Sequence, residues 1–422
     1  MAVPYASTTS GAGTPLQYVV GIDVGSETCL VSILGLDKRP VRPPFAIANA
    51  APGFARLATA LAQLACPPAQ IRVGLEATGR SWENLYQFLL QRGYDLVLLH
   101  PGQTHHFAQQ RGLRAKTDKL DAGTIGRALL SDDLRPAYVP SDLIAAYRDL
   151  VRLHTNLTDE AARYKEELRD LLVVLFPEYT QVFKDPTGPT ALTLLRAYPG
   201  ATAIATAGRD GITTLLQDVA PQKYGPQTAD RLVALAQRSS ASPVAVAARG
   251  RSLQILIDQL RQTQANVSEL ERQITGLLHH DAGAASLQTV PEFGLQTVAV
   301  LRAELGEVAR FPGSAHVVAY AGLDVTVRES GKWKGQRKLS KRGSGALRRC
   351  LFLAALGSLR ARTQSAFGAY YRAMEARGVR GYRALMAVMR KMLVVAYHLL
   401  KSGERYDPAK VWRGAVAGAA GS

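Results

Sequence analysis

Apolar and polar residues follow two different periods along the chain. Before about residue 100, short apolar runs end at glycine, proline or polar residues, as in YVVGIDVG, TCLVSILGL, PFAIANA, IRVGLEA and YDLVLLH. Runs of this length are typical of strands. FARLATALAQLA and SWENLYQFLLQRG have helical spacing and lie among them. The pattern predicts an α/β domain over residues 17–140, with a mixed sheet that opens as an antiparallel meander and continues with parallel pairings.

From Ser141 the apolar residues recur at helical spacing with charged residues between them. This period predicts two long amphipathic helices, at 141–178 and 251–279, that pair antiparallel as a coiled coil. Residues 141–284 are therefore interpreted as a helical linker region. Its part from 185 to 250 has short helical patches and no recognisable site. A structural spacer and a role in oligomerisation or nucleic-acid bracing both remain open for the long helices.

The last region combines apolar helical segments with a dense basic stretch. Residues 285–402 predict a mainly α-helical C-terminal domain. A disordered lead is expected at 1–16 and a flexible tail at 403–422. No stretch of about 18 apolar residues free of charge is present, so no membrane-spanning helix is expected.

The charge balance points to the kind of partner. Among 422 residues the formal net charge is +17, and the pI is about 9.9. An excess of this size favours a polyanion, most commonly nucleic acid, over a membrane surface. Cys29, Cys66 and Cys350 are widely spaced, which argues against a zinc site or a disulfide framework and fits a reducing cytoplasm. The first residues lack the pattern of a secretory signal.

Four carboxylates occupy positions from which they can converge. Asp23 ends the first predicted strand and Glu76 ends the strand IRVGLEA, so the two can share one edge of the sheet. Asp118 and Asp121 are three residues apart and therefore lie on one face of a helix start. Carboxylate oxygens are the ligands that Mg²⁺ prefers. Taken one by one, each acid also fits a turn or a helix cap.

A basic, glycine-rich segment lies between residues 328 and 349, with Glu329 as its one acid. Interleaved glycines suggest a loop whose backbone approaches phosphates, although a solvated charged face is the alternative. Two further lysines, Lys116 and Lys119, flank Asp118. The predicted nucleic-acid contacts in the segment are Arg328, Lys332, Lys334, Arg337, Lys338, Lys341, Arg342, Arg348 and Arg349.

Three serines lie in or beside this segment. A serine hydroxyl is a weak nucleophile that needs a base, a metal or surrounding positive charge for activation. Arginines and lysines also stabilise the charge of a phosphoryl transition state. From chemistry alone, Ser330 is no better a nucleophile than Ser340 or Ser344.

The segments GIDVGSET, GLEATG, GLRAKTDKLDA and ESGKWKGQRKLSKRGSGALRRC together resemble the DEDD-type insertion-sequence transposases with a serine-containing C-terminal domain. These are the bridge-RNA-guided recombinases, which are related to the pilin-gene invertase. The resemblance covers most of residues 17–135 and 285–400. It implies a ribonuclease H-like, Holliday-junction-resolvase-like first domain whose four acids bind Mg²⁺. In this chain they are Asp23, Glu76, Asp118 and Asp121.

The resemblance also selects among the serines. The family carries a nucleophilic serine in a Ser-Gly motif ahead of an SKRG-like segment, which matches Ser330 and leaves Ser340 second. Two departures are Lys332, where a second glycine is usual, and Ser344, where Asp or Asn is usual. The family assembles a composite site from carboxylates and serine between subunits of a tetramer built from dimers.

The implied function is that of a transposase or site-specific recombinase. It cuts and rejoins donor and target DNA through a phosphoserine, with a bridge RNA as guide, in a prokaryotic, nucleoid-associated cytoplasmic setting. Two alternatives stay open. A structure-selective nuclease needs only the carboxylates and water, and a non-catalytic nucleic-acid scaffold needs only the basic segment.

Overall fold

The structure is a computed structural model that describes residues 15–77, 79–110, 118–131, 136–326, 329–330, 333–334, 338–360 and 365–411. For residues 105–106, 108–110, 118–121, 325–326, 329–330, 333–334 and 338 only the backbone is described. The chain forms two compact units, residues 1–141 and 142–422. Most of the predicted lead and of the predicted tail lies outside the described residues.

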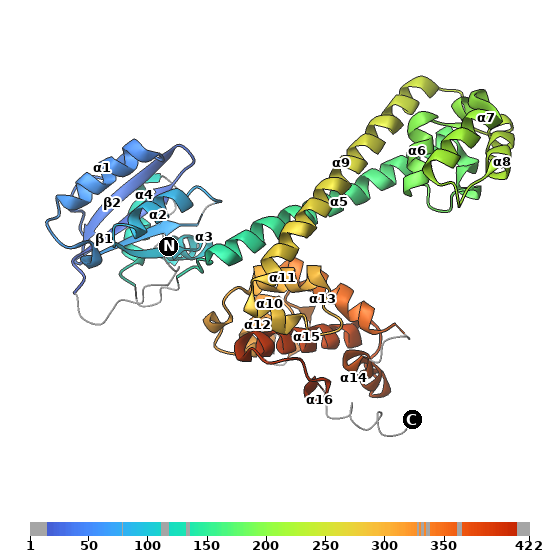
Figure 1. The fold of residues 1–422 in the computed structure, drawn as a ribbon. Helices are drawn as coiled ribbons and strands as arrows, with labels where there is room; N and C mark the ends of the chain where they lie inside the picture. The colour runs from blue at the N-terminus through green and yellow to red at the C-terminus, as the bar shows by residue number, and fades with distance from the viewer. Residues whose placement is uncertain are drawn as a thin grey trace. The chain divides into compact units, whose positions relative to one another are not determined.

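A five-stranded mixed sheet forms the framework of the first unit (Figure 1). Its strand order is β3-β2-β1-β4-β5; β1 to β3 pair antiparallel, whereas β1, β4 and β5 pair parallel. This arrangement confirms the predicted mixed sheet and its opening meander. The strands are β1 (Tyr18–Val24), β2 (Thr28–Gly35), β3 (Phe45–Ala48), β4 (Ile71–Glu76) and β5 (Asp95–Leu99).

Helices pack on both faces of this sheet. On one face, Val20 and Ile22 of β1 share a core with Leu57 of α1 and Leu85 of α2. On the other, Val19 packs with the apolar residues of α4. The two-sided packing explains why the strand segments are nearly continuous apolar runs. The helices of this unit are α1 (Ala51–Ala62), η1 (Pro68–Gln70), α2 (Glu83–Leu90), α3 (Pro101–Gln110) and α4 (Asp118–Ala128).

Two 34-residue helices, α5 (Asp142–Leu175) and α9 (Val246–His279), dominate the second unit (Figure 1). They run antiparallel, because Tyr147 near the start of α5 shares a core with Leu278 near the end of α9. The periodicity predicted both helices and their direction. The structure begins α9 earlier than residue 251, the start expected from the sequence.

A helical cap lies at the far end of this pair, between the end of α5 and the start of α9. Its aromatic and aliphatic residues form one core with the adjoining ends of the long helices. The region without a recognisable site in the sequence is therefore a folded part of the second unit. Its elements are η2 (Pro177–Gln181), α6 (Pro189–Ala197), α7 (Ala201–Val219) and α8 (Pro226–Gln237).

The C-terminal helices pack together around one core at the opposite end of the long pair. None of the described helices combines the length and the apolar content that crossing a bilayer needs. These helices are α10 (Ala282–Leu287), α11 (Leu295–Leu305), η3 (Val308–Arg310), α12 (Ser314–Tyr320), α13 (Gly345–Ser358), α14 (Ala366–Ala376), α15 (Tyr382–Ser402) and α16 (Pro408–Val411).

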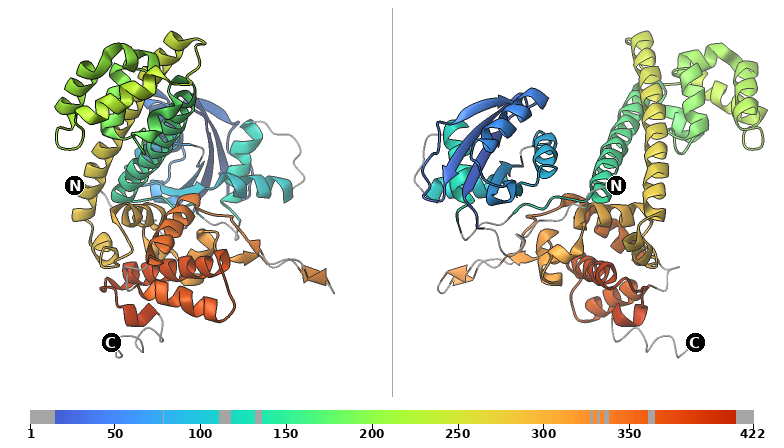
Figure 2. Two further views of the ribbon diagram at one scale, coloured as in Figure 1. Left: turned by 90° about the vertical axis from the view of Figure 1, so that its right-hand side faces the viewer. Right: turned by 60° about the vertical axis from the view of Figure 1, so that its left-hand side comes forward.

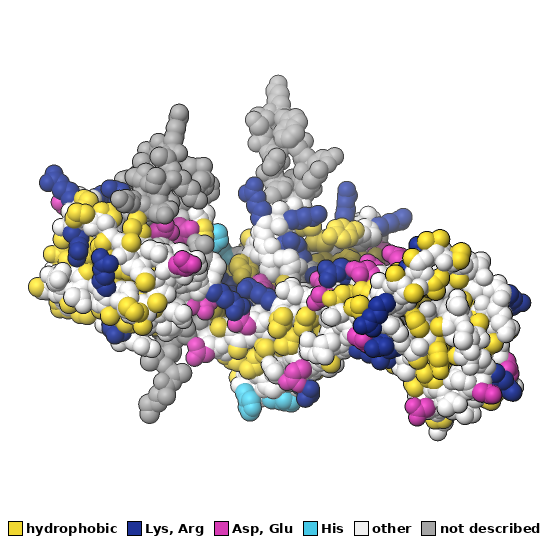
Figure 3. All heavy atoms as spheres, turned by 90° about the horizontal axis from the view of Figure 1, so that it is seen from above, with side chains coloured by type: hydrophobic (Ala, Val, Ile, Leu, Met, Phe, Trp, Pro, Cys, Tyr) yellow, Lys and Arg dark blue, Asp and Glu magenta, His cyan; other side chains and the backbone are white. Residues whose placement is uncertain are grey.

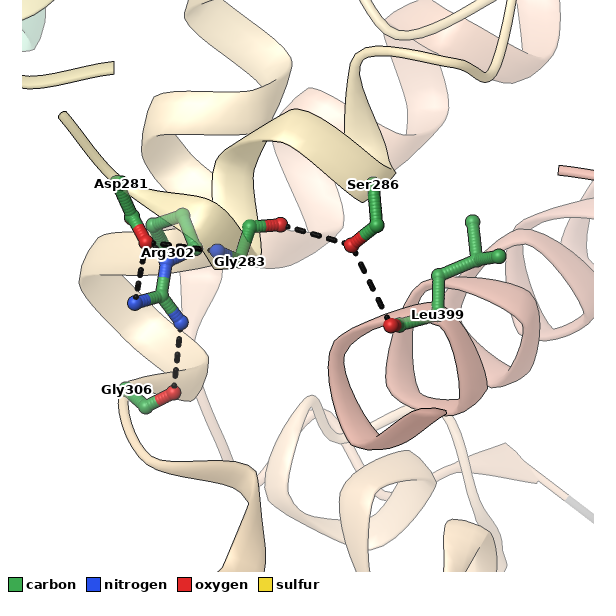
Figure 4. Close-up of polar contacts among 6 residues, drawn as sticks. All are labelled: Asp281, Gly283, Ser286, Arg302, Gly306 and Leu399. Carbon is green, nitrogen blue, oxygen red and sulfur yellow. Dashed lines mark hydrogen bonds and ion pairs between the residues drawn. The ribbon is translucent and has the colours of Figure 1, made fainter. Parts of the chain in front are cut away.

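Buried polar contacts fasten this region together (Figure 4). The Arg302 guanidinium donates to both carboxylate oxygens of Asp281, at 2.5 and 3.1 Å, and to the carbonyl of Gly306 at 3.2 Å. Ser286 Oγ lies within hydrogen-bond distance of the carbonyl of Leu399 in α15, at 3.3 Å. A paired and hydrogen-bonded carboxylate is tolerated inside a protein, whereas an unpaired one is costly. The contacts therefore hold α10, α11 and α15 in a fixed arrangement.

Candidate active site

Asp23 and Glu76 lie next to each other at the carboxyl edge of the first unit's sheet. The register of the parallel pair β1 and β4 matches Ile22 with Leu75, so the following residues, Asp23 and Glu76, are neighbours. Both side chains are partly exposed. The sequence predicted this shared edge from the strand ends alone.

The same two acids face the helix α4. Side chains alternate along a strand, so Gly21 and Asp23 point to one face, and Gly74 and Glu76 continue that face on β4. A Cβ built on Gly21 would lie 2.1 Å from the carbonyl oxygen of Ala122, so α4 packs directly on the backbone of β1. Only glycine permits an approach this close.

The beginning of α4 points toward the two acids. Gly123 lies against Ser32 of β2, and Gly126 lies against Leu34, whose partner in β1 is further from the carboxyl edge. The helix therefore runs away from that edge, and its first turn, Asp118–Asp121, lies toward it. The backbone thus brings all four predicted acids to one end of the sheet. The side chains of Asp118, Lys119 and Asp121 are not described, and Lys116 lies outside the described residues.

Thr104 of α3 contacts the Glu76 carboxylate. Its Oγ1 lies 2.8 Å from Glu76 Oε2 and 2.9 Å from the carbonyl of Pro101, and the threonine is 8% exposed. A buried hydroxyl that donates to one carboxylate oxygen fixes the orientation of that group. Sequence reasoning missed Thr104, because a single threonine in HPGQTHH carries no signal of the strand it will meet.

The negative charge of Asp23 affects the pKa of a nearby thiol, that of Cys29. Burial raises the pKa of Cys29 to about 11, a backbone hydrogen bond to Gly25 lowers it in part, and the Asp23 carboxylate raises it further. The Cys29 thiol is consequently protonated at neutral pH and is not a nucleophile there. It is a buried core side chain beside the acidic edge.

The chemistry of these donors fits a divalent cation. Asp23 and Glu76 supply carboxylate oxygens from adjacent strands, and the backbone of Asp118 and Asp121 lies in the first turn of α4, at the same end of the sheet. Hard cations such as Mg²⁺ take oxygen ligands from one or two carboxylates and from the substrate phosphate. The described side chains contain no group of three or more candidate ligands, and they include only two of these four acids.

The predicted nucleophile lies on a short β-hairpin of the second unit. β7 (Glu329–Ser330) pairs antiparallel with β8 (Trp333–Lys334), so that Ser330 is opposite Trp333. β6 (Val325–Thr326) and β9 (Lys338–Leu339) pair closer to the helices. In Figure 2 these strands extend outward from the helices of their unit. We call residues 325–339 the serine arm.

Much of the predicted basic surface belongs to this arm. Arg328, Lys332 and Arg337 lie outside the described residues. For Lys334, Lys338 and Ser330 the backbone alone is described, so the direction of these side chains is not assigned.

A network of hydrogen bonds, which we call the arm base, joins residues 320–324 to residues 340–344. The Ser340 backbone N–H donates to the Asp324 carbonyl at 3.0 Å, and the Ser340 hydroxyl donates to the Asp324 carboxylate. The Lys341 N–H donates to Gly322 and the Ser344 N–H to Tyr320, at 3.3 and 3.2 Å. Both strands that lead into the serine arm are therefore held together where they leave the helices.

Close backbone packing and one arginine reinforce the arm base. A Cβ built on Gly343 would lie 2.2 Å from the carbonyl oxygen of Tyr320, so no side chain fits there. Arg348 Nη1 donates to the carbonyls of Ala321 and Gly343, at 2.9 and 3.0 Å, and so bridges the two segments.

Comparisons with known proteins match both ends of the chain. A family model described as a transposase matches residues 20–177, and the model of the transposase family IS116/IS110/IS902 matches residues 284–372. The uncharacterized 43.6 kDa protein of insertion element IS110 from Streptomyces coelicolor is 30% identical over 300 residues, which span 69% of this chain and 72% of that protein. This chain belongs to the IS116/IS110/IS902 transposase family.

More distant relatives extend the match. The uncharacterized 42 kDa protein of insertion element IS900 from Mycobacterium paratuberculosis is 27% identical over 334 residues, or 77% of this chain and 81% of that protein. The pilin gene-inverting protein of Moraxella bovis is 22% identical over 338 residues, or 79% of this chain and 81% of that protein. The general activity of this transposase-family chain is DNA recombination.

Two basic-segment positions of the transposase have defined local partners. Ser344 caps α13, because its Oγ accepts a hydrogen bond from the Leu347 N–H at 3.1 Å. Asp, Asn and Ser all favour this capping position, so the serine keeps the function that the more usual Asp or Asn would have. Arg349 forms a bidentate ion pair with Asp159 of α5, at 2.7 and 2.6 Å, which joins α13 to the long helix.

Sequence reasoning also missed Asp324. It lies just before the basic segment in GLDV, where a single acid has no recognisable spacing to Ser340. An acid four residues ahead of a run of basic residues was the available signal. The contact itself depends on the return of the chain through the serine arm.

Proposed function

We propose that this transposase cuts and rejoins DNA through a covalent phosphoserine at Ser330, with Mg²⁺ held by Asp23, Glu76, Asp118 and Asp121. The observation that carries the proposal is the convergence in the first unit. Two acids on adjacent parallel strands face the helix whose first turn bears the other two acids. In this proposal the first unit is ribonuclease H-like. Its mixed sheet and the acids gathered at one edge of that sheet support this assignment.

The four acids have distinct tasks in this scheme. Asp23 and Glu76 provide a fixed pair of oxygens on rigid strands, and Thr104 orients the Glu76 carboxylate. Asp118 and Asp121 close the site from the helix. Bound there, Mg²⁺ supplies positive charge against the phosphate oxygens in the transition state. The acids themselves hold that charge at a defined place beside the DNA backbone.

The serine carries out a transesterification. Ser330 Oγ forms a bond to phosphorus while the bond from phosphorus to one sugar oxygen breaks. The hydroxyl proton passes to a base, and the departing sugar oxygen takes up a proton. Because one phosphoester replaces another, a sugar hydroxyl can reverse the step and rejoin a strand without an external energy source. The basic residues of the serine arm stabilise charge on the five-coordinate phosphorus.

The proposed partners are donor DNA, target DNA and a guide RNA. The net charge of +17 supports binding to polyanions of this kind. We also propose that the chain assembles as a tetramer built from dimers, with α5 and α9 as the assembly arm. Three aliphatic side chains on these helices, Leu153, Val173 and Ile255, are 46 to 66% exposed and suit a further helix as partner.

A covalent-adduct assay tests the mechanism. The full-length protein, kept together with any RNA that co-purifies with it, is incubated with Mg²⁺ and a plasmid that carries its own insertion element with flanking DNA. Protein-linked DNA is then separated under denaturing conditions. We expect an adduct that requires Mg²⁺, is lost in Ser330→Ala and persists in Ser340→Ala, with the phosphate mapped to Ser330 by peptide mass spectrometry.

The alternatives give different results in the same assay. Strand cleavage without any adduct would indicate a nuclease that uses water. Binding without cleavage, with or without Mg²⁺, would indicate a scaffold. An adduct that persists in Ser330→Ala would refute the assignment of the nucleophile. Sequencing of RNA that co-purifies with the protein tests the guide separately, and its absence would remove the guide from the proposal.

A further inference from the structure

The positive charge of the chain is concentrated near its C-terminus. Residues 285–422 contain 23 lysines and arginines against 8 acids, whereas residues 142–284 contain 15 against 16. Residues 1–141 contain 13 against 10. The serine arm accounts for only part of this excess, so another basic surface is present in the C-terminal region.

The helix α15 provides such a surface (Figures 1 and 2). Its 21 residues include no acid, and its buried face is apolar. At 100° per residue, its cationic side chains and one histidine fall on a single face, where they are exposed or half-buried. We call this the α15 face, and it consists of Arg383, Arg390, Lys391, His398 and Lys401.

Several solvent-accessible arginines elsewhere in the second unit are paired with acids. Arg196 pairs with Asp258 at 2.7 Å, and Arg209 pairs with Asp230 at 2.8 Å. Figure 3 likewise shows basic and acidic side chains interspersed over the helical cap. On the α15 face, no lysine or arginine forms an ion pair with another described residue. Its charge is therefore available to an external anion.

The basic surface continues at the start of α15. Arg377 and Arg380 are exposed in the turn that leads from α14, and they prolong the charged face beyond the helix. At the other end, a groove of about 680 Å³ has a mixed lining. Its charged residues include Lys391, Lys401 and Arg405 together with the acids Glu404 and Asp407.

The side of α15 opposite the α15 face packs against the core of the C-terminal helices and holds the face in place. The contact of Ser286 with Leu399 fixes the end of α15, and the opposite side of the helix is buried in the core (Figure 4). The Lys391 ammonium lies 6.0 Å from the centre of the Tyr370 ring of α14, a cation–π distance. A rigid helix of 21 residues is about 30 Å long, so its cations keep a fixed spacing over that length.

We propose that the α15 face binds the phosphate backbone of duplex DNA, as a surface separate from the serine arm. Duplex DNA carries one negative charge per about 1.7 Å of axis, a density that suits a straight row of unpaired cations. Contacts of this kind fix the position of a protein on DNA and do not read its sequence. The inference rests on the proposed DNA-recombining function, for which it supplies a substrate-holding surface.

Salt-dependent binding of a 30-base-pair duplex tests the proposal, without Mg²⁺ and therefore without chemistry. In the full-length chain we compare the triple variant Arg383→Ala/Arg390→Ala/Lys391→Ala with a matched control, Arg231→Ala/Arg238→Ala/Arg251→Ala. The control removes the same charge from exposed positions of α8, its C-terminal boundary and α9. Binding is followed by fluorescence anisotropy between about 50 and 200 mM salt, the range over which phosphate contacts change affinity most clearly.

We expect the α15 variant to lower the slope of log K against log salt by roughly 2 to 3, since each lost phosphate contact removes about 0.9. Its affinity at low salt should fall about tenfold or more, while the control stays close to the wild-type protein. Arg383→Lys/Arg390→Lys should retain the slope, because it keeps the charge.

Three results would overturn the proposal. In the first, the α15 variant and the control triple variant lower the salt slope and the DNA affinity equally. In the second, the lysine variant loses as much DNA affinity as the alanine variant. In the third, the α15 variant loses affinity for a matching RNA probe and keeps its affinity for duplex DNA. If the adduct assay fails while this binding result holds, the proposed chemistry is wrong and the DNA surface stands.

Discussion

At the scale of single residues, Thr104 has the clearest consequence. It lies outside the set of acids, yet its hydroxyl contacts Glu76 Oε2 at 2.8 Å and is almost completely buried. Groups that orient a metal ligand usually change metal affinity by about 10- to 100-fold when they are removed. The hydroxyl thus supports the proposed Mg²⁺ site without contacting the metal.

We therefore predict that Thr104→Val raises the Mg²⁺ concentration needed for half-maximal adduct formation by about tenfold or more. The change keeps the volume of the side chain and removes its donor, so the fold should be retained. Thr59→Val, on the outer side of α1, is the matched control and should leave the Mg²⁺ titration unchanged. An unchanged titration in Thr104→Val would mean that the hydroxyl only packs.

The candidate site was predictable to the extent that it depends on strand ends. Asp23 and Glu76 terminate apolar runs, and parallel strands bring such ends to one edge. Thr104 and Asp324 were not predictable, because each acts on a partner that only the folded chain brings near it. The catalytic roles of the four acids and of Ser330 stay predictions.

At the scale of elements, the arm base controls how firmly the serine arm is held. β6 and β9 have two residues each, so their own ladder contributes little stability. The Ser340 hydroxyl and the Asp324 carboxylate add a charge-assisted hydrogen bond at the point where both strands leave the helices. Such a bond contributes about 1.5–3 kcal/mol.

We predict that Ser340→Ala raises the equilibrium constant for opening of the serine arm by about tenfold or more, because the variant loses that hydrogen bond. The measurement is the rate of tryptic cleavage within residues 325–339, read by intact mass. Adduct formation should become slower without being lost, and duplex binding through the α15 face should stay unchanged. Ser340→Thr should restore the wild-type rates of tryptic cleavage and of adduct formation. Ser252→Ala, which removes an exposed helical hydroxyl from α9, serves as the control. Unchanged cleavage in Ser340→Ala would show that the backbone bonds suffice.

Long periodic elements were predictable, and short ones were not. The periodicity predicted α5 and α9, because a 34-residue amphipathic pattern leaves little ambiguity. It also predicted the mixed sheet from its buried runs. The four strands of the serine arm escaped prediction, since two residues cannot establish a period. The bounds of the cap helices α6 to α8 could not be predicted, because their alanine, threonine and glycine content weakens the apolar periodicity.

At the scale of the whole molecule, the chain separates the two parts of the proposed chemistry. The four acids belong to residues 1–141, and Ser330 belongs to residues 142–422. The proposed reaction needs both at the same phosphate. In an oligomer, one chain can supply both parts, or each can come from a different chain. These arrangements differ in what a mixture of two inactive variants can do.

We predict that the site is shared between chains, in line with the proposed oligomer. Glu76→Gln lacks a carboxylate and Ser330→Ala lacks the nucleophile, so neither forms the adduct alone. Co-expressed as equal amounts, the two should form mixed dimers in which one site of two has both groups intact, restoring about a quarter of wild-type adduct. Replacing the Ser330→Ala chain by a Glu76→Gln/Ser330→Ala chain leaves no intact site and is the control. If each chain built its own site, the mixture would stay as inactive as its components, and the adduct measured for wild type would then come from residues of a single chain.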